Sequence, residues 1–353
     1  MINPAQRARN EAGFELVFHK LTASKMIYEC SMHVENTNGD FIWSKGYGGR
    51  TVDSPMVLTS VSKLFTTTCI LNLLQQGRVS LQDNLSKFFD RETMAGLHVY
   101  KKTDYSDRLR VGNLLFQNTG FPDVFAVGKD CLNKRMVRVD EYVPFEEYVR
   151  LAKEHNKKFV PGTQGKAHYS DLNFEMLGKI IEMLEKSSLH DAYKKYVFQP
   201  LNLQNTYMPE KDSDFIPKIY CKQNALSLPL LIRSIPASGG CISTSRELMK
   251  FIKGFFGGLL FDKSIFQQLR SFATIQYAPP LGQYGGGFVR LNISGIASLF
   301  QCKGELIGHM GGSGAYAYYY PEKDLYFVGD NNQLSAPGKL FTVPLQLAKV
   351  VSD

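Results

Sequence analysis

Near the C-terminus, short strand-like runs succeed one another with only tight turns between them, such as Pro321-Glu322-Lys323-Asp324. Strands joined by short turns pair antiparallel, because parallel strands need long crossover connections. The sequence therefore predicts an antiparallel sheet in this part of the chain. The runs that we expect to form it are 284–293, 297–302, 305–310, 314–320 and 324–330.

Helices and a hairpin are predicted around this sheet. The hairpin pairs residues 26–34 with residues 41–47 across the turn-forming segment Asn36–Asp40. Helices are expected at residues 5–24 and 337–351, and another runs from Ser60 to about Gln76. Apolar residues surround most of this third helix, a pattern typical of a central, buried helix.

The sequence between the hairpin and the C-terminal strands shows a different pattern of predicted secondary structure. Residues 76–235 combine helical segments with irregular loops and several prolines. We therefore expect an α+β fold (an α/β sandwich), in which an antiparallel sheet is flanked by N- and C-terminal helices. Residues 1–75 plus 236–353 would form this sheet domain, and residues 76–235 a mostly helical inserted domain. The active site is expected at the seam, where pockets commonly form.

Composition narrows the classes of function. The 353 residues include 41 Lys+Arg against 33 Asp+Glu, but the positive charges are scattered, so no nucleic-acid partner is expected. The six cysteines are widely spaced, which argues against a zinc site or a disulfide framework, and we expect no cofactor. No secretory signal or membrane span is visible. A cytoplasmic protein is expected, although a secreted chain trimmed of its signal would look the same. The sequence leaves the oligomeric state open.

Ser60 and Lys63 stand three residues apart where the apolar helix begins. Residues at i and i+3 share a helical face, so the hydroxyl and the amine can meet. A desolvated lysine can take the proton of a serine and make it a nucleophile. A lone Ser-x-x-Lys pattern arises by chance about once or twice in such a chain, so it needs support from other motifs.

Two further segments offer that support. Tyr169 precedes another apolar helix, and a nearby lysine ammonium would lower the pKa of its phenol and fit it for proton transfer. A tyrosine at a helix start is, however, more often a packed aromatic side chain. The segment Gly308–Ala315 lies between two strands. Its glycines indicate either a tight turn or backbone N–H groups held close to an oxyanion. The triple glycine Gly285–Gly287 indicates backbone crowding.

Together these motifs resemble those of the serine β-lactamase and penicillin-binding-protein superfamily. The similarity is to its class C β-lactamase-like branch, which includes β-lactamases, D-alanyl carboxypeptidases, D-aminopeptidases and family VIII-type carboxylesterases. The branch pattern is Ser-x-x-Lys, then Tyr-x-Asn, then Lys or His followed by x-Gly. The resemblance extends over roughly residues 10–345. The matching segments are Ser60–Lys63, Leu73–Leu85, Val111–Asp123, Tyr169–Asp171, Pro236–Phe251 and His309–Gly311.

The resemblance implies a role for each motif residue. Ser60 would be the acylated nucleophile, and Lys63 would help to deprotonate it. Tyr169 would act as general base and as proton donor to the leaving group. The backbone N–H groups of Ser60 and Gly312 would form the oxyanion hole. The remaining motif residues would contact the substrate: Asp171, His309 and Gly311.

Two departures from the branch pattern bear on the substrate. Asp171 replaces the asparagine of β-lactamases, and a carboxylate near Lys63 favours the charged ammonium. His309 replaces a lysine and is mostly neutral at physiological pH. Both changes remove positive charge, so β-lactams and muropeptides, which carry a carboxylate, fit less well. We therefore expect a small ester or amide as substrate, with D-alanyl or D-aminoacyl peptides as second choice and β-lactams as third.

Three alternatives remain at this point. Ser170-Asp171 can be aligned with the Ser-Asp-Asn motif of other penicillin-binding proteins, which would make Ser170 the proton shuttle; Leu172 in the third position disfavours this. A non-catalytic relative that only binds ligands is a second possibility. An α/β-hydrolase with Ser313 as nucleophile is the third, but its Gly-x-Ser-x-Gly motif fails at Ala315.

Overall fold

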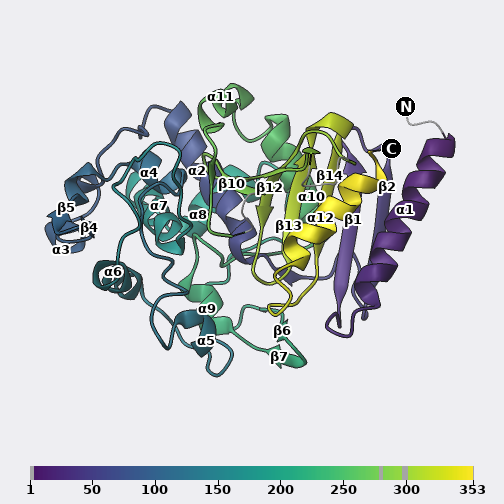
Figure 1. The fold of residues 1–353 in the computed structure, drawn as a ribbon, viewed down its shortest axis with the longest axis horizontal. Helices are drawn as coiled ribbons and strands as arrows, with labels where there is room; N and C mark the ends of the chain where they lie inside the picture. The colour runs from purple at the N-terminus through teal and green to yellow at the C-terminus, as the bar shows by residue number, and fades with distance from the viewer. Residues whose placement is uncertain (1–3, 278–280, 296–300, 353) are drawn as a thin grey trace.

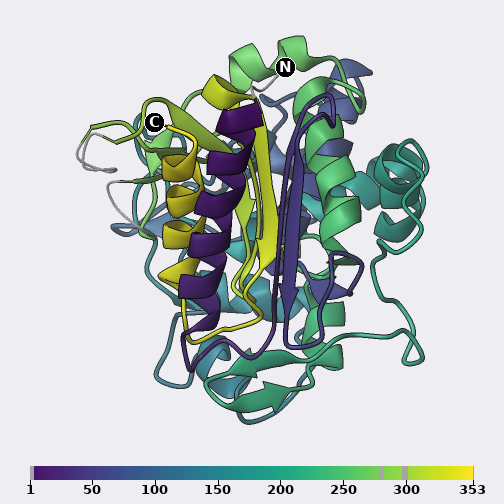
Figure 2. The ribbon, with the colours of Figure 1, turned by 90° about the vertical axis from the view of Figure 1, so that its right-hand side faces the viewer.

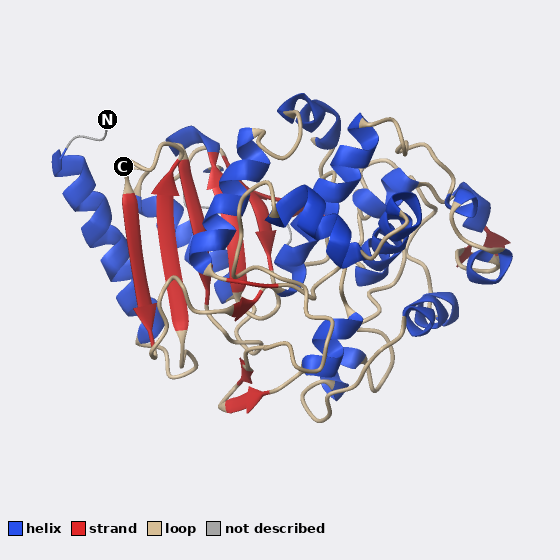
Figure 3. Cartoon of the chain, turned by 180° about the vertical axis from the view of Figure 1, so that it is seen from behind, coloured by secondary structure: helices blue, strands red, loops and turns tan. Residues whose placement is uncertain are grey.

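The computed structural model describes residues 4–277, 281–295 and 301–352. Over these residues the chain forms an eight-stranded antiparallel sheet that occupies one side of the molecule (Figures 1 and 3). The C-terminal strands are neighbours in sequence order, as their short turns predicted. In spatial order the strands are β2 (Ile42–Tyr47), β1 (Cys30–Asn36), β14 (Leu325–Asp330), β13 (Ala315–Tyr320), β12 (Glu305–Met310), β11 (Val289–Asn292), β10 (Gly282–Tyr284) and β9 (Ala273–Thr274).

Helices cover both faces of this sheet. The terminal helices α1 (Pro4–Thr22) and α12 (Lys339–Val350) lie side by side on one face, as Figure 2 shows. Helix α10 (Ser245–Gly257) packs on the opposite face against β1, β13 and β14. Phe14 of α1 is fully buried and packs on Phe41 and Trp43. The predicted α+β class, with an antiparallel sheet between terminal helices, is confirmed.

Residues 76–235 lie beyond the β9–β12 end of the sheet and are mostly helices and loops (Figure 1). The domain boundaries at residues 75 and 236 stay a prediction. The helices here are α3 (Arg91–Met94), α4 (Val111–Leu115), α5 (Leu132–Arg135), α6 (Phe145–Glu154), α7 (Asp171–Glu185), α8 (Leu189–Tyr193) and α9 (Pro229–Ser234). The hairpins are β4 (Val99–Tyr100) with β5 (Thr103–Asp104), and β6 (Ile219–Cys221) with β7 (Asn224–Leu226).

Two smaller elements lie outside these layers. A two-stranded sheet pairs β3 (Met56–Val57), just before Ser60, with β8 (Ile242–Ser243). A short helix, α11 (Phe266–Leu269), precedes β9. No described helix is long and apolar enough to cross a membrane.

The helix that carries the Ser-x-x-Lys motif lies at the centre of the molecule. A 3₁₀ turn, Thr59–Ser62, leads into α2 (Lys63–Gln75). Phe65 of α2 is fully buried and makes edge-to-face contacts with Phe251 of α10, at a centroid distance of 4.5 Å, and with Tyr193 of α8, at 5.9 Å. The helix therefore joins the packing of the sheet side to that of the helical side, and its predicted central burial is confirmed.

The run expected at 284–293 differs from the structure. It is two strands, β10 and β11, joined by a turn that contains the triple glycine. Gly287 has a φ of 90°, and a Cβ there would lie 2.4 Å from the side chain of Thr67, so the crowding expected of these glycines is confirmed. Of the run expected at 297–302, residues 297–300 lie outside the described residues, and residues 301 and 302 are not in a strand.

We expect Phe65→Ala to lower the free energy of unfolding by about 3–5 kcal/mol, because it leaves a cavity where the two sides of the molecule meet. Urea denaturation followed by circular dichroism measures the change. The control is Leu16→Ala on α1, whose side chain is 55% exposed; its effect should stay within about 0.5 kcal/mol. Equal stability of wild type and Phe65→Ala would contradict the central role of α2.

Candidate active site

The backbone just before Ser60 is held in an unusual conformation. Thr59 has a φ of 41°, in the left-handed region that residues other than glycine seldom adopt. Its hydroxyl lies 3.1 Å from Ser313 Oγ and accepts a hydrogen bond of 3.2 Å from the Ser313 N–H. The loop after β12 thus fixes the turn on which Ser60 stands, and local strain of this kind is typical of functional sites.

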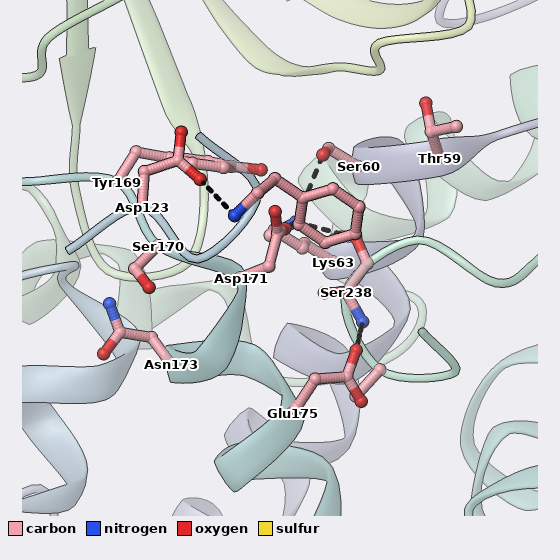
Figure 4. A network of polar contacts seen from close by, with 12 residues as sticks. Thr59, Ser60, Lys63, Asp123, Tyr169, Ser170, Asp171, Asn173, Glu175 and Ser238 are labelled. Carbon is pink, nitrogen blue, oxygen red and sulfur yellow. Dashed lines mark hydrogen bonds and ion pairs between the residues drawn. The ribbon is translucent and has the colours of Figure 1, made fainter. Parts of the chain in front are cut away.

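The Lys63 ammonium is completely buried and donates three hydrogen bonds. Its acceptors are Ser60 Oγ at 3.1 Å, Asp171 Oδ1 at 2.5 Å and the backbone carbonyl of Ser238 at 2.7 Å. Figure 4 shows Ser60, Lys63 and Asp171 converging from α7 and from the turn before α2. The structure therefore brings the serine and the lysine together, as the i, i+3 spacing predicted.

Burial and charge act on Lys63 in opposite directions. Burial lowers the pKa of its amine, whereas the nearby carboxylate of Asp171 raises it, and the net direction is downward. Asp171 is the first residue of α7. The expected proximity of Asp171 and Lys63 is confirmed, but its effect on the amine is outweighed by burial.

Tyr169 lies directly beside the lysine. Lys63 Nζ is 4.9 Å from the centroid of the Tyr169 ring, and the side chain is 8% exposed. Its hydroxyl is buried and interacts with the side chain of Ser60, the residue expected to be the nucleophile. Burial, followed by the charge of Asp171, raises the pKa of this phenol well above its usual value. The lowered pKa expected from the sequence is therefore wrong, because desolvation of the phenolate exceeds the attraction of the ammonium.

Ser170, the alternative proton shuttle, points elsewhere. It is the N-cap residue of α7, and its backbone N–H donates to the side chain of Gln117 at 2.9 Å. In Figure 4 its hydroxyl is directed toward Asn173 and away from Ser60. The geometry thus favours Tyr169 over Ser170.

The two glycines after His309 differ in their surroundings. A Cβ on Gly311 would lie 2.2 Å from the carbonyl oxygen of Leu58, so a glycine is needed where β12 meets the turn before Ser60. Gly312 is exposed, and nothing lies within 4 Å of where its Cβ would be. The open position of Gly312 leaves its backbone accessible to a substrate next to Ser60.

His309 is only 1% exposed and lies behind Tyr169, with 6.3 Å between the ring centroids. Its Nε2 is 3.4 Å from the hydroxyl of Tyr284, and its Nδ1 lies 2.8 Å from the backbone oxygen of Met310. Burial, with a contribution from the charge of Lys63, lowers the pKa of His309 to about 3. The imidazole is therefore neutral, as expected from the sequence.

A cavity of about 450 Å³ opens over these residues. Its lining includes Ser60, Tyr169, Asp171, His309, Gly311 and Gly312, so the sequence-predicted site residues share one pocket, except Lys63, which lies beneath Ser60. Among the described residues of the lining, the charged side chains are two aspartates and none is a lysine or arginine.

Asp123 is the second of these aspartates, and sequence reasoning missed it. It is 7% exposed and accepts hydrogen bonds from the Tyr277 hydroxyl and, at 3.0 Å, from the Phe125 N–H. Burial, followed by the charge of Asp171, raises its pKa to about 6. Its place at the end of the segment Val111–Asp123, which resembles the superfamily, was the available signal.

Glu175 was also missed. It lies one helical turn after Asp171 on α7 and is 6% exposed. Its carboxylate accepts a 2.9 Å hydrogen bond from the N–H of Ser238, the residue whose carbonyl binds Lys63 (Figure 4). Burial raises the pKa of Glu175 to about 7. An acidic residue inside an apolar helical pattern, at i+4 from Asp171, was the signal in the sequence.

Comparison with known proteins identifies the family. A family model described as Beta-lactamase matches residues 36–338, most of the chain. The chain therefore belongs to the beta-lactamase family, and the resemblance seen in its motifs is confirmed. Among the described residues, no group of three or more His, Cys, Asp or Glu side chains is arranged to hold a metal ion.

Individual relatives are distant. "Protein flp" of Staphylococcus aureus (strain MRSA252) is 28% identical over 190 residues, which are 50% of this chain and 34% of that protein. The chain thus spans about a third of that relative. The D-stereospecific amidohydrolase from Streptomyces sp. superposes with a TM-score of 0.72 at 22% identity, over 92% of this chain and 95% of that one. EstCE1, described as a hydrolase with promiscuous acyltransferase activity, superposes with a TM-score of 0.78 at 16% sequence identity. The superposition covers 98% of this chain and 99% of EstCE1. These two structures show the same fold.

Tyr169→Phe should reduce kcat about 10²–10⁴-fold on any substrate that wild type turns over, because it removes the hydroxyl that lies beside Ser60 and Lys63 and can transfer a proton. Ser170→Ala removes a hydroxyl of the next residue and should change kcat less than about threefold. Steady-state kinetics on both variants make the comparison, with circular dichroism to confirm folding. A larger loss in Ser170→Ala than in Tyr169→Phe would exchange the two roles.

Proposed function

We propose that the protein is a serine hydrolase that forms an acyl-enzyme at Ser60 and cleaves an ester or amide bond of a small substrate. The observation that carries the proposal is the 3.1 Å contact between Lys63 Nζ and Ser60 Oγ at the base of an open cavity. A buried lysine with a lowered pKa can accept the proton of a serine hydroxyl. Packing alone does not require a buried amine next to a serine hydroxyl, whereas nucleophilic catalysis can use this arrangement.

The lowered pKa of Lys63 and the raised pKa of Tyr169 support a scheme for proton transfer during acylation. Neutral Lys63 would take the proton from Ser60 Oγ as the oxygen attacks the carbonyl carbon. Tyr169, protonated because its pKa is raised, would donate its proton to the leaving group as the ester or amide bond breaks. The Lys63 ammonium would then return a proton to the Tyr169 phenolate. This assigns the role of base to Lys63, whereas the family resemblance suggested Tyr169.

Hydrolysis of the acyl-enzyme would use the same groups. A water molecule would attack the acyl carbon and give its proton to Lys63, and the ammonium would return a proton to Ser60 Oγ as the acyl bond breaks. The backbone N–H groups of Ser60 and Gly312 would bind the oxyanion of both tetrahedral intermediates. The exposed position of Gly312 supports this role.

The charge of the cavity favours uncharged substrates over carboxylates. Its described lining carries Asp123 and Asp171 but no lysine or arginine, and His309 is neutral. A substrate carboxylate would meet repulsion without a cation to pair with. We therefore rank esters and amides first, D-alanyl or D-aminoacyl peptides second and β-lactams third. The two structural neighbours, an amidohydrolase and a hydrolase with promiscuous acyltransferase activity, are compatible with this order.

The test uses a p-nitrophenyl ester, a D-alanyl p-nitroanilide and a chromogenic cephalosporin. Wild type should show a burst of p-nitrophenol equal to the enzyme concentration and prefer the ester. Ser60→Ala should abolish the burst and lower kcat by at least about 10³-fold, because the acyl-enzyme cannot form. A non-catalytic protein would show equal residual rates in wild type and Ser60→Ala, and no labelling of Ser60 by a fluorophosphonate.

A specific observation favours a second candidate, hydrolysis of amides with a free amine. Asp123 is a buried carboxylate within the cavity, and its hydrogen bonds come from an uncharged phenol and a backbone N–H. A buried carboxylate gains from a cationic partner, and a substrate ammonium would supply one. This would place aminoacyl amides among the preferred substrates.

The pH dependence tests this candidate. Because the pKa of Asp123 is about 6, the carboxylate gains its charge between pH ~5 and ~7, while a substrate α-amine stays protonated. The ratio of kcat/KM for an aminoacyl p-nitroanilide to that for a neutral ester should therefore rise about tenfold over this range. Taking the ratio cancels the titration of Lys63, which both substrates share. Asp123→Asn should make the ratio independent of pH, and a ratio that still rises in this variant would exclude Asp123 as the cause.

A further inference from the structure

The cavity beside Ser60 has one wall that consists of apolar side chains and that the reaction itself does not require. Its members come from five segments: the loop after α5, the β6–β7 hairpin, α9 with the residue that follows it, the loop after β14, and the first turn of α12. Figure 1 shows α5, α9, β6 and β7 gathered along the lower edge of the molecule. We call this surface the apolar wall and define it by Val137, Ile219, Leu231, Ile235, Leu334 and Phe341.

Polar contacts outside the cavity hold these segments together. The carboxylate of Asp140 accepts the backbone N–H groups of Leu230 at 2.8 Å and Leu231 at 3.0 Å, which joins the loop after α5 to α9. The side chain of Gln333 accepts from the N–H of Lys222 and donates to its carbonyl, both at 2.9 Å, which joins the hairpin to the segment after β14. These hydrogen bonds fix the positions of the segments that form the apolar wall.

The charged residues of the lining lie near Tyr169, although apolar side chains such as Phe125 and Ile275 line that part of the cavity as well. Near Tyr169 the lining carries Asp123, Asp171 and Tyr277. On the other side, the segment after β14 that supplies Leu334 runs along the loop that contains Gly312. The N–H of Gln333 donates to the carbonyl of Ser313 at 2.7 Å. A leaving group that takes a proton from Tyr169 lies near these charged residues, so the acyl group extends toward the apolar wall.

We infer that the apolar wall binds the acyl group of the substrate, and that the site prefers acyl chains of about six to ten carbons over acetyl. The inference rests on the proposed function and specifies its substrate class. A cavity of about 450 Å³ is within the range that encloses drug-sized ligands, and an acetyl group would leave most of it empty. Burying each additional methylene group on this surface raises kcat/KM about fourfold, until the chain fills the cavity.

Two valines of one loop allow a matched test. Val137 lines the cavity and is 40% exposed, whereas Val139 is 52% exposed and lies outside the lining. A tryptophan at position 137 would occupy the space of the acyl chain, and one at position 139 would face solvent. The measurement is kcat/KM for p-nitrophenyl acetate, butyrate, hexanoate and octanoate, each below its micelle-forming concentration, on wild type, Val137→Trp and Val139→Trp.

Wild type should prefer octanoate over acetate by at least tenfold. Val137→Trp should reduce this octanoate-to-acetate ratio at least tenfold, because it fills the cavity, and Val139→Trp should leave the ratio unchanged. Equal reduction by both variants, or a wild-type rate that falls steadily from acetate to octanoate, would overturn the inference.

Two further measurements separate this inference from the proposed function. Labelling of Ser60 by a small fluorophosphonate tests the nucleophile without regard to chain length; labelling without chain-length preference rejects the apolar wall as an acyl site but keeps the hydrolase. Absence of labelling rejects both. The second measurement compares the hydrolysis rates of octyl acetate and methyl octanoate, followed by titration of the released acid at constant pH. It shows whether the apolar wall binds the acyl part or the alcohol part of the ester. A preference for methyl octanoate supports acyl binding, and a preference for octyl acetate overturns it.

Discussion

The hydrogen bonds of the buried Lys63 side chain are the interaction on which the site depends. Burial of an ammonium costs several kcal/mol unless its hydrogen bonds are satisfied, and here the three acceptors come from different parts of the chain. Ser60 precedes α2, Asp171 begins α7, and Ser238 belongs to the segment that leads toward the sheet side. The contact with Ser60 is local, whereas those with Asp171 and Ser238 join distant segments, so the buried amine couples the helical side to the sheet side next to the nucleophile.

The same burial sets the ionisation of the surrounding groups. Water is excluded around Lys63, Tyr169 and His309, so each is shifted toward its neutral form. The result is an amine fit to accept a proton next to a phenol fit to donate one. Asp123, with a raised pKa of about 6, adds a carboxylate to the part of the cavity near Tyr169. The apolar wall lies on the other side of the cavity. A substrate with one polar and one apolar part can therefore bind in a single orientation.

Much of this could be predicted from local pattern. Apart from the runs at 284–293 and 297–302, the expected strands and helices lie within a few residues of those observed, because hydrophobic period and turn residues act over short stretches of chain. The features that could not be predicted depend on contacts between distant segments. Glu175 and Asp123 lie in patterns that read as ordinary helix and loop, and their importance follows from neighbours far away in sequence. The split of residues 284–293 into two strands was missed because the glycine turn is required by its contact with Thr67 of α2.

The sequence by itself determined which groups are present and which of them are local neighbours. The i, i+3 spacing places Ser60 beside Lys63 whatever surrounds them, since helical geometry is set by the backbone. Only the tertiary structure decided what those groups can do. The direction of the Tyr169 pKa was wrong from sequence because it depends on how completely the fold removes water. The apolar wall could not be predicted for a related reason: its side chains come from five separate segments, and no local pattern shows that they share one cavity.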